Sequence, residues 1–286
     1  MTMQPAAERT AIAGLGRRLG PDVLAAVYAL FREEQGHLAA AQPVHAADIE
    51  YGDHSRQRLD LYAPVSRDGP VPVLLWVHGG GFLRGEKSSV DHPFNAHAAR
   101  WAARNGMLGA VMNYRLAPDH GWPAGGEDVG LAVDWLRENG AAHGGDRARI
   151  VAMGTSAGAV HVATHLRLRE ETGLAAAVLL SGLYGFTPLD ERDTLYYGSA
   201  ADYSDRWPKE AMVATSLPLL LAGAEYDPPR FQAEFVGLLA ARLERHGVLP
   251  RSFSASGHNH FSLAYHLGTA DTRLADEVLA FIGDLA

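Results

Sequence analysis

The sequence predicts an α/β protein whose central sheet is mostly parallel and carries helices on both faces. Continuous apolar runs such as Val71–Val77 and Leu108–Tyr114 alternate with longer stretches whose apolar residues recur at helical spacing. A strand that is apolar on both sides must be covered on both sides, which is typical of parallel sheets between two layers of helices. The 286 residues suffice for one such domain, and we find no internal repeat or low-complexity linker.

The N-terminal region predicts two helices followed by a hairpin. Apolar residues recur at helical spacing between residues 10 and 40, and Gly20-Pro21 separates the two helices. Ala47–Tyr51 and Arg58–Tyr62 are expected to pair at an edge of the sheet. Beyond the strands 71–77 and 108–114, the expected elements are the helices Asp91–Asn105, Gly126–Asn139, Ala157–Glu171, Phe231–Arg245 and Thr272–Leu285, and the strands Arg149–Met153, Ala175–Leu180, Leu217–Ala222 and Arg251–Ser254.

One long stretch, residues 184–216, shows no clear pattern. Stretches of this length often form lids or binding loops, so we expect a cap-like insertion here, with the N-terminal helices (residues 1–42) contributing to the same cap. The alternative interpretation is an ordinary surface loop packed by its own aromatic side chains. These aromatic residues are Tyr184, Phe186, Tyr196, Tyr197, Tyr203 and Trp207.

Composition excludes several classes of function. The net charge of −8 with interspersed acids and bases disfavours a nucleic-acid partner, because phosphate binding depends on clustered Lys and Arg. The absence of cysteine excludes disulfides and thiolate-held zinc. The first twenty residues carry charges where a secretory signal is apolar, and no apolar run is long enough for a membrane span. We therefore expect a cytoplasmic protein without a membrane partner.

The pentapeptide Gly154-Thr-Ser-Ala-Gly158 lies between the apolar run Ile150–Met153 and a helical stretch. This strand, G-x-S-x-G, helix context is typical of a nucleophilic serine raised on a sharp turn. Such a turn needs small neighbours because larger side chains would collide with the strand or the helix. The N–H of Ala157 would then point to the place where an oxyanion forms. A chance match among 31 glycines is the alternative, which the flanking elements disfavour.

A serine hydroxyl becomes a strong nucleophile only beside a base that an acid orients. In this arrangement the acid and then the histidine follow the serine, at the ends of the last two strands. Glu225 and Asp227 lie in the first of these loops, and we favour Asp227, because it follows the turn and Pro228-Pro229 leads into a helix. In the second loop the residues alone leave His258 and His260 both open as the base.

Neither a metal nor a cofactor is predicted. A site made of His258 and His260 would need further ligands, and cysteine cannot supply them. His161 and His165 have the spacing of a zinc pair, but position 162 is valine instead of the glutamate of H-E-x-x-H. Packing within a helix is the better interpretation of that pair.

The second glycine-rich segment, His78-Gly-Gly-Gly-Phe82, ends the strand 71–77. Three glycines allow the loop to double back and direct successive N–H groups to one point, as an oxyanion site requires. A dinucleotide-binding loop is excluded because Arg84 occupies the third glycine position of G-x-G-x-x-G. A phosphate-binding loop is excluded because no Gly-Lys-Ser/Thr follows.

Five motifs together resemble the hormone-sensitive-lipase-like and carboxylesterase branch of the α/β-hydrolases. They are HGGGF (78–82), NYRLAP (113–118), GTSAG (154–158), EYDP (225–228) and HNHF (258–261), and the similarity extends from about residue 45 to the end. The resemblance implies one α/β-hydrolase domain over residues 1–286 with a small helical cap. It assigns the nucleophile to Ser156, the acid to Asp227, the base to His260, and the oxyanion donors to Gly80, Gly81 and Ala157.

The sequence departs from this branch at three places. Thr155 stands where lipase-like members have aspartate, Ala159 stands where they have glycine, and Phe261 follows His260 directly instead of after a glycine. With Gly85-Glu-Lys87, the last feature is closer to kynurenine-formamidase-like and feruloyl/acetyl-esterase-like relatives. In those relatives the histidine directly before the phenylalanine is the base, which favours His260 over His258.

The sequence therefore predicts a serine hydrolase that cleaves carboxylic esters with small or aromatic acyl groups through an acyl-enzyme. Phe82, Tyr184 and Tyr197 are the residues that we expect to bind the substrate. An amidase of the arylformamidase type with the same three residues is the nearest alternative, and a non-catalytic ligand-binding protein on this fold is a further one. The expected partner is a small-molecule ester, and a homodimer is left open.

Overall fold

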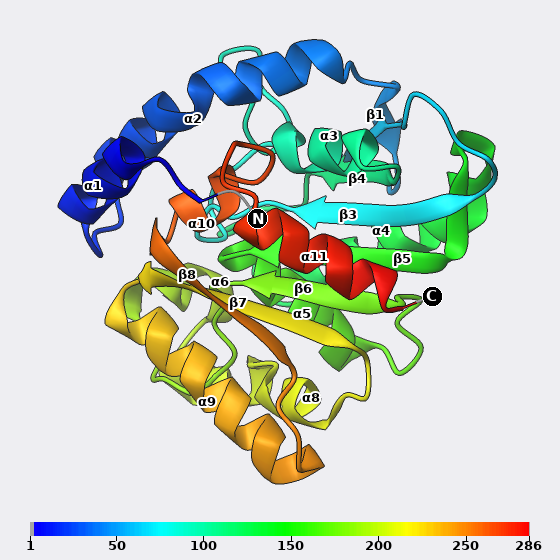
Figure 1. Ribbon diagram of the computed structural model, residues 1–286. Coiled ribbons are helices and arrows are strands. Elements are labelled where there is room, and N and C mark those ends of the chain that lie inside the picture. Colours follow the sequence, from blue (N-terminus) through cyan, green and yellow to red (C-terminus); the bar gives the residue numbers. More distant parts are fainter. Residues whose placement is uncertain (1–2, 286) are drawn as a thin grey trace.

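The computed structural model describes residues 3–285, which fold around one eight-stranded sheet (Figure 1). The strand order is β1-β2-β4-β3-β5-β6-β7-β8, with antiparallel pairing at β1–β2 and β2–β4 and parallel pairing elsewhere. This mixed sheet confirms the predicted fold class and the predicted edge hairpin. The strands are β1 (Ala46–Glu50), β2 (Arg58–Tyr62), β3 (Val71–Val77), β4 (Leu108–Met112), β5 (Gly145–Thr155), β6 (Ala176–Leu180), β7 (Leu219–Tyr226) and β8 (Arg251–Asn259).

Both faces of the sheet are buried under helices. Alternate residues of β3 enter two separate cores: Leu74 and Trp76 enter one, and Val73, Leu75 and Val77 enter the other, all at most 1% exposed. Complete burial of an aliphatic side chain stabilises the fold by roughly 1.5–3 kcal/mol, so the central strands anchor the molecule. The first core lies under α3 (Ala96–Arg104) and α11 (Arg273–Gly283), and the second under α4 (Ala124–Asn139), α5 (Ala157–Leu168) and α9 (Pro229–His246).

Two N-terminal helices, α1 (Ala6–Leu15) and α2 (Pro21–Ala41), lie outside these layers (blue in Figure 1). As predicted, the break falls at Gly20-Pro21, where proline occupies the first helical position and loses no hydrogen bond. Ile12 and Phe31 pack there against Phe94 and Tyr265. Within residues 3–285, no helix is both long enough and apolar enough to cross a membrane.

Several element boundaries differ from the prediction. Helix α3 begins at Ala96 instead of position 91, because Asn95, just before it, has a left-handed φ of 65°. Strand β8 continues past the predicted position 254 to Asn259, where it still pairs with Tyr226 of β7. Helix α5 ends at Leu168, short of position 171. The longer β7 and β8 carry the chain directly to the loops with the candidate acid and base.

The stretch 184–216 is not irregular, and that part of the prediction was wrong. Ser199 and Asp202 form a capping box that begins one of its helices, a serine–x–x–acid signal that the sequence already contains. Its role as a cap stays a prediction. The remaining short helices are η1 (Gly140–His143), η2 (Glu191–Asp193), α6 (Thr194–Tyr197), α7 (Ala200–Arg206), α8 (Lys209–Ala214) and α10 (Ser262–Tyr265).

Candidate active site

Ser156 is the single residue between the end of β5 and the start of α5, and its backbone has φ 53° and ψ −121°. Non-glycine residues seldom adopt a positive φ, and such strain is common at functional sites. A Cβ on Gly158 would lie 2.0 Å from the Val77 carbonyl oxygen, and a Cβ on Gly154 would lie 2.6 Å from Gly158. Only glycine fits at either position, so the tight strand–turn–helix geometry expected from the sequence is present.

Ser156, His260 and Asp227 form one hydrogen-bonded row. Ser156 Oγ is 3.0 Å from His260 Nε2, and His260 Nδ1 is 2.8 Å from Asp227 Oδ1. Because an ionised carboxylate only accepts hydrogen bonds, His260 Nδ1 carries the proton and the lone pair of Nε2 faces the serine hydroxyl. Asp227 and His260 are 1% and 4% exposed, whereas Ser156 is partly exposed. The row can therefore take a proton from the serine at a site that solvent reaches.

The alternative acid and base lie elsewhere. His258 Nδ1 contacts Ser262 Oγ, and its Nε2 contacts Asp271. Glu225 is exposed and accepts hydrogen bonds from Ser256 Oγ and the N–H of Gly257. Of the competing residues in these two loops, the structure brings Asp227 and His260 to the serine.

Asp227 accepts two further hydrogen bonds, and the sequence analysis did not identify Ser181, which donates one of them. Its Oδ2 accepts hydrogen bonds from Ser181 Oγ at 2.6 Å and from the N–H of Ala224 at 2.7 Å. These bonds compensate the burial of its charge and fix the oxygen that faces His260. Ser181 directly follows β6, so its place at the carboxyl edge of the sheet was the signal that could have identified it.

The glycine-rich loop lies against the serine. A Cβ on Gly79 would be 3.3 Å from Ser156 Cβ. Gly80 and Gly81 have φ values of 138° and 60°, and a Cβ on Gly80 would lie 1.9 Å from the Arg84 carbonyl oxygen. The loop therefore requires glycine at position 80. Ala157 begins α5, where the first N–H groups have no carbonyl partner inside the helix. The three predicted oxyanion donors thus belong to the two segments that flank Ser156.

His78 and Tyr114 hold the glycine-rich loop in place through hydrogen bonds and ring stacking. Tyr114 Oη donates to the carbonyl of His78 at 2.9 Å, and the two rings stack at 4.4 Å. His78 Nδ1 lies 2.7 Å from the Gly79 carbonyl oxygen. Arg56 donates to the carbonyls of Tyr114 and Gly85 and so connects both ends of the support. The NYRLAP segment therefore holds the glycine-rich loop in place.

Aromatic side chains form one wall beside the serine. Phe82 stacks on Tyr196 at 4.1 Å, with an interplanar angle of 4°, and contacts the edge of Tyr197. Phe82 and the two tyrosines belong to one apolar cluster with Ala157 and Phe231. The centroid of the Phe231 ring is 4.3 Å from that of the His260 ring. Two of the predicted substrate-binding residues, Phe82 and Tyr197, are therefore grouped next to the row.

Tyr184, the third of these residues, packs elsewhere. It belongs to the core beneath α5 and α9 and not to the cluster that contains Ala157 and Phe231, so its position gives the binding role no support. Its N–H donates to Glu234 Oε2 at 2.6 Å, and the carboxylate of Glu234, which is 0% exposed, also accepts the N–H of Gly185, Phe186 and Thr187. Glu234 thus anchors the start of the stretch 184–216 on α9. The available signal was a charged residue on the apolar face of that predicted helix.

The candidate metal ligands do not favour an ion. His161 Nδ1 contacts the Tyr196 hydroxyl, and His165 Nε2 contacts the Thr172 carbonyl, so the zinc-like pair does not converge. Among residues 3–285, ligand atoms of His258, His266 and Asp271 lie within 4.8 Å of one another. Arg273, however, binds both oxygens of Asp271, at 2.9 and 2.6 Å. The guanidinium thus already neutralises the carboxylate that an ion would use.

We expect the fold to lose stability between pH 6.5 and pH 4. Burial lowers the pKa of His78 and His97 to about 4 and that of His161 to about 3. A histidine in the unfolded chain has a pKa near ~6.5. Below that pH the unfolded chain binds protons that the folded chain does not, so the free energy of unfolding decreases as the pH falls.

Urea unfolding at pH 7, 6, 5 and 4 measures this dependence. At pH 5 these three histidines give the unfolded chain about three additional protons, and they contribute to the slope of the unfolding free energy together with other buried histidines whose pKa is lowered, such as His165 and His266. In His97→Gln the difference in bound protons between the unfolded and folded chains, to which the slope is proportional, should decrease by about one. An unfolding free energy that stays constant between pH 7 and pH 5 would contradict the neutral, buried state of these rings.

Comparisons with known proteins point to one group of enzymes. The family model BD-FAE matches residues 59–178. The chain is 31% identical over 196 residues to "Carboxylesterase NlhH" of Mycobacterium tuberculosis, covering 59% of this chain and 60% of that protein. It is also 31% identical to "Probable carboxylic ester hydrolase LipM" of the same organism, of which it spans 47%. The chain thus spans about half of the length of these curated relatives.

Solved structures give the same picture over the whole chain. "Bacterial Heroin Esterase" superposes with a TM-score of 0.69 at 25% identity and covers 100% of this chain and 98% of that one. An esterase from the archaeon Pyrobaculum calidifontis superposes with a TM-score of 0.63, also at 25% identity, over 100% of both chains.

Proposed function

We propose that this chain, which resembles α/β-hydrolase carboxylesterases in sequence and in fold, is a serine hydrolase that cleaves carboxylic esters through an acyl-enzyme. The observation that carries the proposal is the row Ser156–His260–Asp227, with contacts of 3.0 and 2.8 Å. A serine hydroxyl attacks a carbonyl only when a base accepts its proton, and the row supplies that base.

In the acylation step, Ser156 Oγ forms a bond to the carbonyl carbon of the ester while its proton moves to His260 Nε2. Asp227 stabilises the resulting imidazolium through Nδ1. The carbonyl oxygen becomes an oxyanion, for which the N–H groups of Gly80, Gly81 and Ala157 are the proposed donors. The bond to the alcohol oxygen then breaks, the alcohol takes the proton from His260, and an acyl-Ser156 ester remains.

Deacylation repeats the same steps with water. His260 Nε2 accepts a proton from a water molecule, whose oxygen bonds to the acyl carbon. The second oxyanion collapses, the bond to Ser156 Oγ breaks, and the serine oxygen takes the proton back. The products are a carboxylic acid, an alcohol and the free enzyme. No step needs an additional reactant.

The aromatic wall supports small or aromatic acyl groups as substrates. Phe82 and Tyr197 are 2% and 1% exposed, and Phe231 is 7% exposed, so rings already fill the space beside Ser156. Flat or short acyl groups need little room beside Ser156, whereas a long chain would have to displace these packed rings. The proposed cap consists of α1, α2 and the stretch 184–216. A homodimer and a cytoplasmic location stay predictions of the sequence.

Initial rates on p-nitrophenyl acetate, butyrate, benzoate, octanoate and laurate test this proposal. We expect kcat/KM to be highest for the acetate, butyrate or benzoate and to fall by about tenfold or more at laurate. A long acyl chain that does not fit would shift the ester carbonyl away from its reactive position beside Ser156. A higher kcat/KM for N-formylkynurenine would instead indicate the amidase. If the protein shows no ester turnover and no labelling by a fluorophosphonate, the result would favour a non-catalytic ligand-binding protein.

A further inference from the structure

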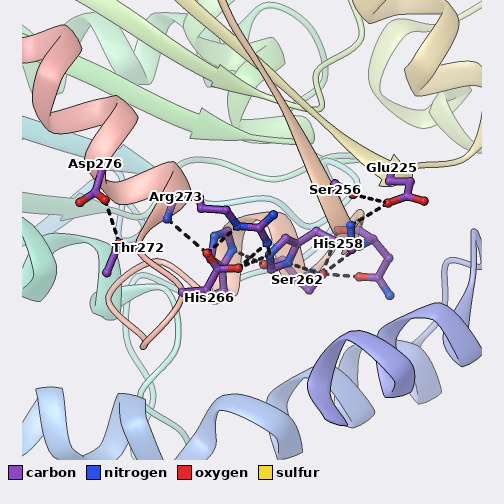
Figure 2. Close-up of polar contacts among 11 residues, drawn as sticks. Glu225, Ser256, His258, Ser262, His266, Thr272, Arg273 and Asp276 are labelled. Atoms are coloured by element: carbon purple, nitrogen blue, oxygen red, sulfur yellow. Dashed lines mark hydrogen bonds and ion pairs between the residues drawn. The ribbon is translucent and has the colours of Figure 1, made fainter. Parts of the chain in front are cut away.

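A second row of hydrogen-bonded side chains, Ser262, His258 and Asp271, involves the residues on either side of His260 in the sequence, and the proposed reaction does not use it. Figure 2 shows His258 and Ser262 next to each other, with His266 and Arg273 close by. Ser262 Oγ is 3.1 Å from His258 Nδ1, and His258 Nε2 is 3.0 Å from Asp271 Oδ2. Ser262 is 0% exposed, and His258 and Asp271 are each 1% exposed. Because no substrate can reach the Ser262 hydroxyl, this row is not a second nucleophilic centre.

The hydrogen bonds of this row have a fixed direction. Burial raises the pKa of Asp271, but hydrogen bonds from Arg273 and His258 outweigh burial and keep that pKa well below its usual value. The ionised carboxylate accepts, so His258 Nε2 carries the proton and Nδ1 can accept from the Ser262 hydroxyl, whose oxygen also lies 3.3 Å from the Asn259 carbonyl oxygen. Burial lowers the pKa of His258, which agrees with a neutral ring.

The row ends in the backbone turn that carries His260. Ser262 Oγ accepts the N–H of Asn259 at 2.8 Å, while Asn259 Oδ1 accepts the N–H of Ser262 at 2.9 Å and that of Phe261 at 3.2 Å. His260 lies in the middle of this closed turn. The orientation of the Ser262 hydroxyl, which His258 determines, therefore fixes the residue directly before His260.

We propose that Asp271, His258 and Ser262 are positioning residues that hold the His260 ring between Asp227 and Ser156. The proposal rests on the proposed function, because it assigns the purpose of the row to that reaction. His260 has to satisfy two contacts at once, of 2.8 and 3.0 Å. A displacement of ~1 Å at such a site lowers the rate by about 100-fold, so a small shift of the turn is sufficient to slow the reaction.

The row reaches the turn from a rigid part of the fold. Arg273 belongs to the first turn of α11, and it binds Asp271 through its backbone N–H at 3.2 Å and through its guanidinium. His266 stacks on His258 at 4.0 Å and makes a hydrogen bond from Nδ1 to the Ser262 carbonyl. The turn with His260 is thereby connected to a helix that packs on the central sheet.

Two variants and one control test the proposal. His258→Phe keeps a ring for stacking but removes both nitrogen atoms, and Ser262→Ala removes only the hydroxyl. His165→Asn is the control. His165 is also fully buried and makes one hydrogen bond, to the Thr172 carbonyl, but it lies in α5 and does not contact the turn around His260. Each protein is assayed on p-nitrophenyl acetate for kcat and KM separately, and its thermal midpoint is recorded.

We expect both row variants to lose about tenfold or more in kcat while KM changes less than about twofold, because orientation and not binding is impaired. The rate of fluorophosphonate labelling at Ser156 should fall by the same factor. The control should keep its kcat even where its thermal midpoint falls. In proton NMR, which needs no turnover, the signal of the proton between His260 Nδ1 and Asp227 should move or broaden in the row variants only.

Three results would overturn the proposal. The first is a kcat within twofold of wild type in both row variants, and the second is an equal loss of kcat in His165→Asn. The third is stoichiometric zinc on the purified protein with activity that EDTA removes, which would make His258, His266 and Asp271 a metal site. If His258→Phe does not fold, Ser262→Ala decides. A wild-type protein without turnover or labelling would refute the proposed function instead, and the NMR signal would still report on the row.

Discussion

Replacing Ser156 by alanine is expected to lower kcat on p-nitrophenyl esters by about 10⁵- to 10⁶-fold, the loss typical of a missing nucleophile in a row of this kind. The fold should be unaffected, because the Ser156 hydroxyl contacts His260 at a partly exposed position and fills no core. The backbone at position 156 has a φ of 53°, which serine and alanine tolerate similarly, so the thermal midpoint should change little.

Two measurements make this test decisive. Mass spectrometry of the wild-type protein after fluorophosphonate treatment should find the adduct on Ser156, and the variant should remain unmodified. Circular dichroism and the thermal midpoint should show that the variant is folded. Residual activity above about a tenth of wild type in the purified variant would exclude Ser156 as the nucleophile, since the expected loss is several orders of magnitude larger.

The sheet could be predicted because its strands carry an unambiguous signal. Leu74 and Trp76 enter one core and Val73 and Leu75 the other, so β3 is apolar at every one of these positions, as only a strand covered on both faces can be. The ends of β8 gave no such signal. Its last residues, Gly257 to Asn259, are glycine and polar residues that are buried only because the tertiary structure surrounds them.

Two helices of the stretch 184–216, α6 and α8, could not be predicted from local sequence. Helix α6 has four residues and α8 has six, lengths at which intrinsic propensity is too weak to form a helix alone. Distant contacts hold this stretch instead: Glu234 accepts four backbone N–H groups, and Arg230 pairs with Asp193 at 2.5 Å. Such partners, far apart in the sequence, leave no periodic pattern.

The candidate site was predictable where chemistry restricts the residue type. A serine row needs an acid and a histidine after the last two strands, which limited the choice to two residues in each loop. The residues alone could not separate His258 from His260, because both lie in the same short segment. The structure separates them by position: β8 ends at Asn259, so His258 lies inside the strand and contacts Asp271, whereas His260 lies just beyond the strand.

Replacing His260 by alanine should reduce kcat nearly as much as Ser156→Ala does. Without the base, Ser156 Oγ keeps its proton, and the two residues act as one unit whose losses do not add. The double variant should therefore be no slower than either single variant. Steady-state rates on one aryl ester, measured for both single variants and the double variant, test this expectation directly.

His258→Ala is the matched comparison, because it removes the same side chain two positions earlier in the same segment. Its effect should be about tenfold, since the variant loosens the turn around His260 but leaves a base beside the serine. The two histidines thus differ by about four orders of magnitude in the expected loss, far more than any difference in folding would produce. The opposite order, with His258→Ala the slower variant, would move the base to His258 and contradict the contact between His260 and Ser156 as the origin of activity.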